Sequence, residues 1–202
     1  KTALWLHTLE RHLGWDQVRE ILSVFYQRWQ FRHPRPEDFF AVVNEVSGRD
    51  LSWYFDQVHG GTQTFDYAVQ QVSRLRDRGF IDGDREPAFR DPIDDRGLTR
   101  TTVTVRRRGD GIFPVDVLVV FDDGETVRER WDGREPWRVF TYERAARAVR
   151  VEVDPDRVLL LDVDYANNSW TATPRAGAAA TKWTLRWMIW LQDLMLTYAF
   201  LV

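Results

Sequence analysis

The sequence of 202 residues contains no cysteine, which excludes disulfide bonds and thiolate metal sites. Lysine is nearly absent as well, since Lys1 and Lys182 are the only two, and arginine carries the remaining positive charge, as a GC-rich genome would produce. The net charge of −3 gives no broad positive field that would favour nucleic acid or anionic lipid. The chain starts at Lys1 without a signal-peptide pattern, so we expect it to be part of a longer protein.

Histidine is scarce, and the four present do not form a metal motif. HTLERH resembles the His-Glu-x-x-His signature of zinc proteases, but His7 and His12 are five residues apart instead of four. On one helix their side chains would diverge by roughly 140°, so both cannot bind one ion. Thr8 also stands where the signature has its general-base glutamate. The sequence therefore predicts ordinary polar positions on an amphipathic helix.

Residues 1–61 have apolar side chains at helical spacing, interrupted by typical helix boundary residues. The expected boundary residues are Gly14, Asp16, Pro36, Gly48 and Asp50. Asp16 and Asp50 are expected to cap the second and fourth helices, and the fourth is expected over LSWYFDQV. We predict a compact antiparallel array of four helices with short connections.

After Gly61 the spacing of apolar residues changes from 3.6 to 2, which indicates strands. The expected strands lie at 65–69, 103–105, 114–121, 126–131, 137–142, 149–153 and 158–163. Residues 114–121 are apolar on both faces, so we expect them to form a central strand. About seven strands predict an immunoglobulin-like β-sandwich over residues 62–165, with a surface loop from Asp82 to Gly97.

Residues 166–181 read as a connector, and residues 182–202 as a helix rich in tryptophan. One narrow stripe of that helix carries Lys182, Arg186, Asp193 and Thr197. Three interpretations stay open: an amphipathic helix packed against protein, a helix in a membrane interface, and a membrane span. The expected contacts with a membrane surface or with a second copy involve Trp183, Trp187, Trp190 and Leu194.

Two charged stretches are candidate binding sites. Asp82, Asp84 and Glu86 alternate like the start of a calcium loop, but the EF-hand glycine and the closing glutamate are absent. The stretch Arg106–Arg108 would suit a phosphate, yet it also suits the charged end of a strand leading into a turn. In both cases the sequence favours the structural interpretation, an acidic surface loop and a strand end.

Two further stretches carry weak signals. Residues 167–169 fit the glycosylation sequon, a short pattern of low specificity. The aromatic run at 53–55 would suit ligand stacking, but core packing is the favoured interpretation. The sequence shows no Ser/His/Asp set, no glycine-rich phosphate loop and no pair of catalytic carboxylates.

KTALWLHTLERHLG (1–14) and EDFFAVVNEVSGRDLSWYFDQ (37–57) resemble the region after the active site in gluzincin aminopeptidases. This zinc metallopeptidase family includes membrane alanyl aminopeptidase and leukotriene A hydrolase. The matching positions are Lys1 and Ala3, Glu37 to Phe40, Ser47 to Leu51, Trp53, Phe55 and Gln57. The resemblance is specific over residues 1–60, looser over 62–165 and absent at the C-terminal helix.

The resemblance implies an α+β fold in which the helical array ends a peptidase catalytic domain and a β-sandwich follows. It also implies that the zinc ligands, the general-base glutamate and the catalytic tyrosine lie upstream of Lys1. We therefore expect no catalytic, cofactor-binding or metal-binding residue in this chain, and zinc in a bacterial parent protein. Its partners would be the upstream catalytic domain and, in the parent, a peptide substrate. The alternative is a non-catalytic interaction module that binds a membrane or a partner through its C-terminal helix.

Overall fold

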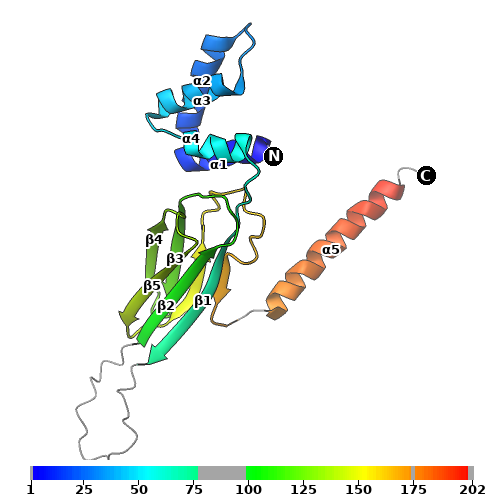
Figure 1. The fold of residues 1–202 in the computed structure, drawn as a ribbon. Helices are drawn as coiled ribbons and strands as arrows, with labels where there is room; N and C mark the ends of the chain where they lie inside the picture. The colour runs from blue at the N-terminus through cyan, green and yellow to red at the C-terminus, as the bar shows by residue number, and fades with distance from the viewer. Residues whose placement is uncertain (1, 77–98, 174–175, 200–202) are drawn as a thin grey trace, which may run out of the picture. The chain divides into compact units, whose positions relative to one another are not determined.

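The computed structural model describes residues 2–76, 99–173 and 176–199. Contacts between these residues define two compact units, Lys1–Trp170 and Thr171–Val202. The first unit contains an array of helices followed by two antiparallel sheets, and the second contains one long helix. The chain therefore has the predicted α+β fold with a C-terminal helix (Figure 1).

The helical array lies where the apolar spacing predicted it. Its elements are α1 (Thr2–Leu13), α2 (Trp15–Trp29), α3 (Pro36–Ser47), α4 (Ser52–Phe55) and the π-helical turn η1 (Asp56–Gly60). Gly14 separates α1 from α2 with a φ of 91°, and Gly48 ends α3 with a φ of 64°. Pro36 opens α3 as expected, because the first helical position needs no backbone N–H.

The two predicted aspartate caps need correction. Helix α2 begins at Trp15, so Asp16 lies inside its first turn, where a carboxylate is favoured by the helix dipole but caps nothing. Asp50 stands two residues before α4 and accepts a hydrogen bond from the Ser52 N–H at 3.0 Å, while Leu51 occupies the capping position. The fourth expected helix is also divided, because its second half takes the wider π-helical geometry of η1.

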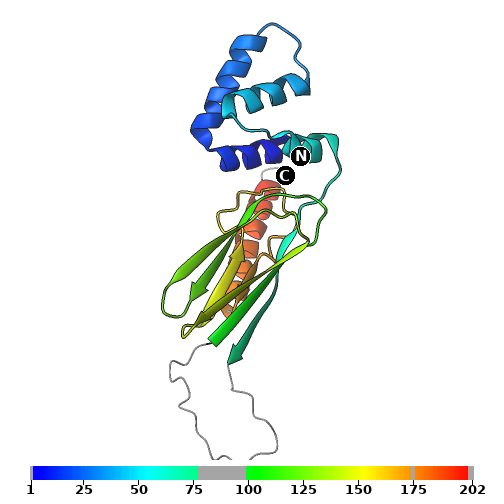
Figure 2. The same ribbon diagram turned by 60° about the vertical axis from the view of Figure 1, so that its left-hand side comes forward.

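Among the residues that the structure describes, seven strands form two sheets (Figure 2). They are β1 (Tyr67–Arg76), β2 (Thr99–Arg107), β3 (Val115–Phe121), β4 (Thr126–Trp131), β5 (Trp137–Arg144), β6 (Ala148–Val153) and β7 (Ser169–Thr171). One sheet has the order β1-β2-β5 and the other β4-β3-β6-β7. The expected central strand is confirmed, since β3 pairs with both β4 and β6.

The strand expected at 158–163 is wrong. The carboxylate of Asp154 accepts the backbone N–H groups of Val158 and Leu159, each at 2.9 Å, which turns the backbone at the start of this segment. The segment forms an isolated parallel β-bridge, in which Asp162 pairs with Phe65. The seventh strand is β7, which lies inside the connector expected at 166–181. The surface loop predicted from Asp82 to Gly97 lies outside the described residues.

The change from helix to strand after Gly61 does not separate two cores. One cluster of buried apolar side chains runs from the helices into the sheets. In the helices, Phe40 stacks on Phe55 with ring centroids 4.0 Å apart, and Trp5 meets Phe55 edge-on. Between the sheets, Tyr67 meets the fully buried Trp131 edge-on. The helical array and the sheets therefore share apolar packing as parts of one unit.

The second unit contains α5 (Ala176–Ala199), which starts six residues earlier than predicted. The alanine-rich end of the expected connector favours helix, because alanine has the highest helix propensity. The large apolar side chains described on α5 are exposed: Trp183, Leu185, Trp187, Met188, Ile189, Trp190, Leu191, Leu194, Met195 and Leu196. Among the described residues, no helix combines the length and the apolar character needed to cross a membrane.

Candidate functional site

The two histidines of the HTLERH stretch have separate surroundings on α1. The exposed His7 Nδ1 lies 3.0 Å from Glu10 Oε2 on the next turn. The partly buried His12 packs edge-on against Phe113, with ring centroids 5.3 Å apart, and against Trp53. Burial lowers the pKa of His12, and the positive charges of Arg130 and Arg49 lower it further. The two imidazoles therefore do not form a common metal site.

Zinc does not fit the side chains that the structure describes. No group of three or more histidine, aspartate or glutamate residues among them is arranged to hold a metal ion. A catalytic zinc site needs three protein ligands around one open position. Residues 2–76, 99–173 and 176–199 offer no such set, so no catalytic step can be routed through a metal held by them.

A pocket of about 610 Å³ opens between the helices and the sheets of the first unit. Trp53, Gln57, Ile112 and Pro114 line it, and the exposed Asp132 and Arg134 stand among its lining residues. No nucleophile with an adjacent base is found in this lining, and the charged pair is not buried. The pocket is a feature of the helix-to-sheet junction, and Asp132 is the one carboxylate in its lining.

The side chain of Gln57 joins the helical array to the segment before β3 by hydrogen bonds to backbone atoms. Its Nε2 donates to the carbonyl oxygens of Trp53 at 2.9 Å and Ile112 at 3.0 Å, and its Oε1 accepts the Ile112 N–H at 2.6 Å. On α1, Thr8 Oγ1 accepts the N–H of Leu160 at 3.1 Å. Together these contacts position the array against the sheets, and the sequence patterns gave no sign of either pairing.

At the same junction, the side chain of Tyr67 binds the backbone of Phe113 in the segment before β3. Its hydroxyl accepts the Phe113 N–H at 2.7 Å and donates to the Phe113 carbonyl oxygen at 2.9 Å. Burial raises the pKa of Tyr67 to about 12, so the phenol stays protonated and able to donate. Gly133 makes room for this hydroxyl, since a Cβ there would lie 2.5 Å from Tyr67 Oη. Tyr67 is thus a structural tyrosine that sequence spacing placed only as a strand residue.

Two buried aspartates were also missed by the sequence patterns. Asp162 accepts the Tyr67 N–H and an Asn168 side-chain N–H, both at 3.1 Å. The backbone of Asp154 has a positive φ of 52°, and its carboxylate accepts hydrogen bonds from two backbone N–H groups. Burial raises the pKa of both carboxyl groups above the usual aspartate value. Because both are occupied by hydrogen bonds that shape the segment after β6, they act as loop organisers.

The remaining candidate stretches are mostly structural. Tyr54 and Phe55 are buried in the core, as favoured for the run at 53–55, whereas Trp53 lines the pocket. Strand β2 ends at Arg107, which donates to the carbonyl oxygens of Gly133 and Gly109, so the expected strand end is confirmed. Within the sequon, Asn167 Nδ2 donates to Asp66 and Asp164. Asp82, Asp84 and Glu86 lie outside the described residues.

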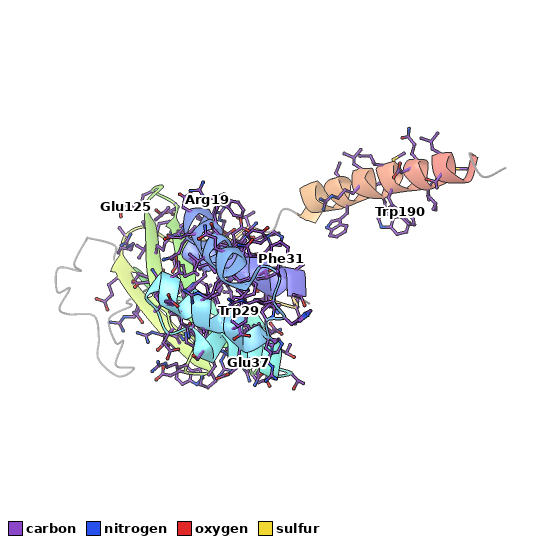
Figure 3. All side chains as sticks on the ribbon, turned by 90° about the horizontal axis from the view of Figure 1, so that it is seen from above. Arg19, Trp29, Phe31, Glu37, Glu125 and Trp190 are labelled. Carbon is purple, nitrogen blue, oxygen red and sulfur yellow. The ribbon has the colours of Figure 1, made fainter. Side chains whose placement is uncertain are left out.

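Helix α2 has a second apolar surface besides the one that packs in the core. Trp15, Leu22 and Tyr26 lie within about 40° of one another at 100° per residue. They are 57%, 43% and 65% exposed. We call these three residues the outer stripe of α2. The buried face of the helix, with Val18 and Ile21, lies about a quarter turn away. Figure 3 shows the side chains of this helical part, including Arg19 and the exposed Phe31.

The comparisons with known proteins add a structural likeness. No protein-family model matches the chain, and no curated protein matches its sequence. The chain is similar to the crystal structure of Legionella pneumophila aminopeptidase A in complex with aspartic acid, with 13% identity and a TM-score of 0.47. The match covers 82% of this chain and 17% of that chain, so the chain spans about a sixth of its length. A likeness at this level assigns neither a family nor an activity.

Proposed function

We propose that this chain is a non-catalytic part of a bacterial zinc aminopeptidase-like protein. In this proposal α1–α4 wall the peptidase cleft, and the two sheets hold the helices in place. The sequence resemblance at 1–14 and 37–57 supports it. The single structural observation that carries it is the outer stripe of α2, an apolar surface that the first unit leaves exposed.

The residues that carry the resemblance have clear structural tasks in this chain. Phe40 and Phe55 stack on each other in the core of the array, and Gln57 binds the backbone of Ile112 in the segment before β3. Asp50 accepts a backbone N–H just before α4. These tasks all concern how the array is built and oriented. They are consistent with a supporting part whose matching residues preserve a shape.

The outer stripe of α2 would face the upstream catalytic domain. An amphipathic helix needs one apolar face to pack in its own unit, and α2 already packs Phe25 against Phe39 of α3. A second stripe that contains an exposed tryptophan and tyrosine is typical of a surface that another protein part covers. The resemblance supports the catalytic domain of the same polypeptide as that part.

The chemistry in such a protein would come from the upstream part. Zinc would polarise the peptide carbonyl and activate water, and a glutamate would move the proton. The residues of this chain would exclude water and fix the shape of the cleft wall. Among the described residues, none is assigned a proton-transfer step.

The docking of α2 can be tested in the protein encoded by the complete gene. Leu22→Arg places a charge in the outer stripe, and Val139→Arg on β5 is a matched control, since the two side chains are 43% and 42% exposed. We expect Leu22→Arg to reduce aminopeptidase activity at least about tenfold, because a charge buried without a partner misplaces the wall. Val139→Arg should leave activity unchanged. Equal activities of the two variants would contradict the proposed docking.

The complete open reading frame provides a second, independent test. It should encode His-Glu-x-x-His followed by a further glutamate ligand upstream of Lys1, and a tyrosine between that motif and Lys1. A frame without the zinc motif would refute the assignment to a zinc aminopeptidase-like protein.

A further inference from the structure

Helix α5 lies in the second compact unit, and its apolar side chains need an explanation of their own. Trp183, Trp187 and Trp190 are 65%, 62% and 56% exposed. Figure 3 shows Trp190 standing out from the α5 ribbon. A run of exposed tryptophan, leucine and methionine side chains of this length is unusual on a protein surface in water.

The apolar side chains of α5 surround most of the helix. At 100° per residue, those from Trp183 to Leu196 cover an arc of about 260°. Between residues 183 and 197, Thr184 and Gln192 are the only polar residues inside this arc. Arg186, Asp193 and Thr197 occupy the remaining narrow stripe, together with the helical position of Lys182. The surface that covers α5 must therefore enclose it on several sides.

A dimer of two α5 helices would cover too little of this surface. Trp183, Trp187, Trp190 and Leu194 have the 4-3-4 spacing of a coiled-coil seam. In a stable two-stranded coiled coil, the positions that face away from the seam carry polar side chains. Here those positions would be occupied by the apolar residues Met188, Ile189, Met195 and Leu196. These four side chains are 64%, 66%, 67% and 52% exposed. Pairing would leave them in water, so a second copy is not the occupant that fits.

The net charge of the second unit, residues 171–202, is opposite in sign to that of the whole chain. Residues 171–202 contain three cationic residues, Arg175, Lys182 and Arg186, against the single carboxylate of Asp193. The whole chain has a net charge of −3. The positive residues all precede the centre of α5, and tryptophan is the residue most typical of the boundary between lipid and water. Positive charge next to an apolar face complements an anionic phospholipid surface.

We infer that α5 binds the surface of an anionic phospholipid bilayer and lies in its interface, with the stripe of Arg186, Asp193 and Thr197 toward water. Asp193 and Arg186 oppose a central position in the hydrocarbon, because each costs about 2.5 to 3.5 kcal/mol at the middle of a membrane span. An interfacial position keeps both in contact with water and still removes the wide apolar arc from it. This inference is independent of the peptidase proposal, since it rests on α5 alone.

Vesicle flotation with the whole chain tests the inference. The chain should float with vesicles of three parts phosphatidylcholine to one part phosphatidylglycerol, and less with phosphatidylcholine alone. Replacing Trp183, Trp187 and Trp190 with alanine should lower partitioning about 1,000-fold, since each of the three buried aromatic side chains contributes about tenfold. Arg186→Gln should lower it about fivefold on the anionic vesicles only.

The matched control is Trp15→Ala combined with Trp137→Ala, because both tryptophans are 57% exposed and lie in the first unit. This control should float like the unchanged chain, and brominated lipid should quench its fluorescence as well. Absence of flotation, or an equal loss in the control, would overturn the inference. The inference would also be overturned by a stable oligomer that depends on the three α5 tryptophans and does not bind vesicles. In that case other copies of the chain, and not lipid, would cover the apolar side chains of α5.

Discussion

Gln57 and Ile112 bind each other in both directions across the junction between helices and sheets. The Ile112 N–H donates to Gln57 Oε1 at 2.6 Å, and Gln57 Nε2 donates to the Ile112 carbonyl oxygen at 3.0 Å. The side-chain amide thus takes the place of a neighbouring strand for this residue. Because the same Nε2 also donates to the Trp53 carbonyl oxygen, one side chain connects η1, α4 and the segment before β3.

Gln57→Leu should lower the free energy of unfolding by about 2 kcal/mol, because the backbone N–H and C=O of Ile112 would lose their partner while the shape is kept. Urea unfolding followed by circular dichroism measures the change. Gln27→Leu is the control, since Gln27 is exposed and its side chain donates a hydrogen bond to Ser23 on the same helix. A loss no larger than that of the control would show that the Gln57 pairing contributes nothing to stability.

Gly133→Ala should destabilise the fold more than Gly124→Ala. Both glycines have positive φ, 72° and 87°, so both variants carry the same kind of backbone strain, about 1 kcal/mol. Only at position 133 would the new Cβ also collide, at 2.5 Å from Tyr67 Oη and 2.6 Å from the Phe113 carbonyl oxygen. We expect a total loss of about 3 kcal/mol there. Thermal unfolding of both variants gives the comparison, and equal losses would contradict it.

His12 should make stability depend on pH below neutrality. Burial lowers its pKa in the folded state, so as pH falls through about 6.5 the unfolded chain takes up the proton first. Protonation therefore favours unfolding, and stability should fall between pH 7 and pH 5.5. The effect should stay below about 1 kcal/mol, because solvent screens this partly exposed ring.

Urea midpoints at pH 7, 6.3 and 5.5 measure the pH dependence of stability in the unchanged chain and in His12→Gln. The variant should flatten this dependence, whatever it does to absolute stability, because the buried imidazole is removed. An unchanged slope in His12→Gln would remove the proposed role of burial at this ring.

Local signals in the sequence were enough to place most elements of this fold. Pro36 and Gly48 mark the two ends of α3, since proline suits a first turn and glycine suits positive φ at a helix end. The apolar run at 114–121 marks β3 because it is buried between two neighbouring strands. In each case the residues themselves carry the physical preference that fixes the element.

Pairings between distant positions could not be predicted in the same way. The run VLLLDV has strand-like residues, yet Asp154 binds the N–H groups of Val158 and Leu159 and turns the chain. The pairing of Gln57 with Ile112 joins residues 55 positions apart, and no periodic pattern records it. The junction pocket could not be predicted from the sequence for the same reason. Its lining residues come from separate segments of the chain, and only the fold brings them together.

The most direct test of the central claim compares zinc content and aminopeptidase activity in the chain of residues 1–202 and in the protein encoded by the complete gene. Both would be purified, loaded with zinc, dialysed and assayed with an aminoacyl p-nitroanilide. We predict stoichiometric zinc and hydrolysis in the complete protein, and neither in the chain alone. Stoichiometric zinc held by side chains of residues 1–202, together with hydrolysis by that chain, would contradict the account.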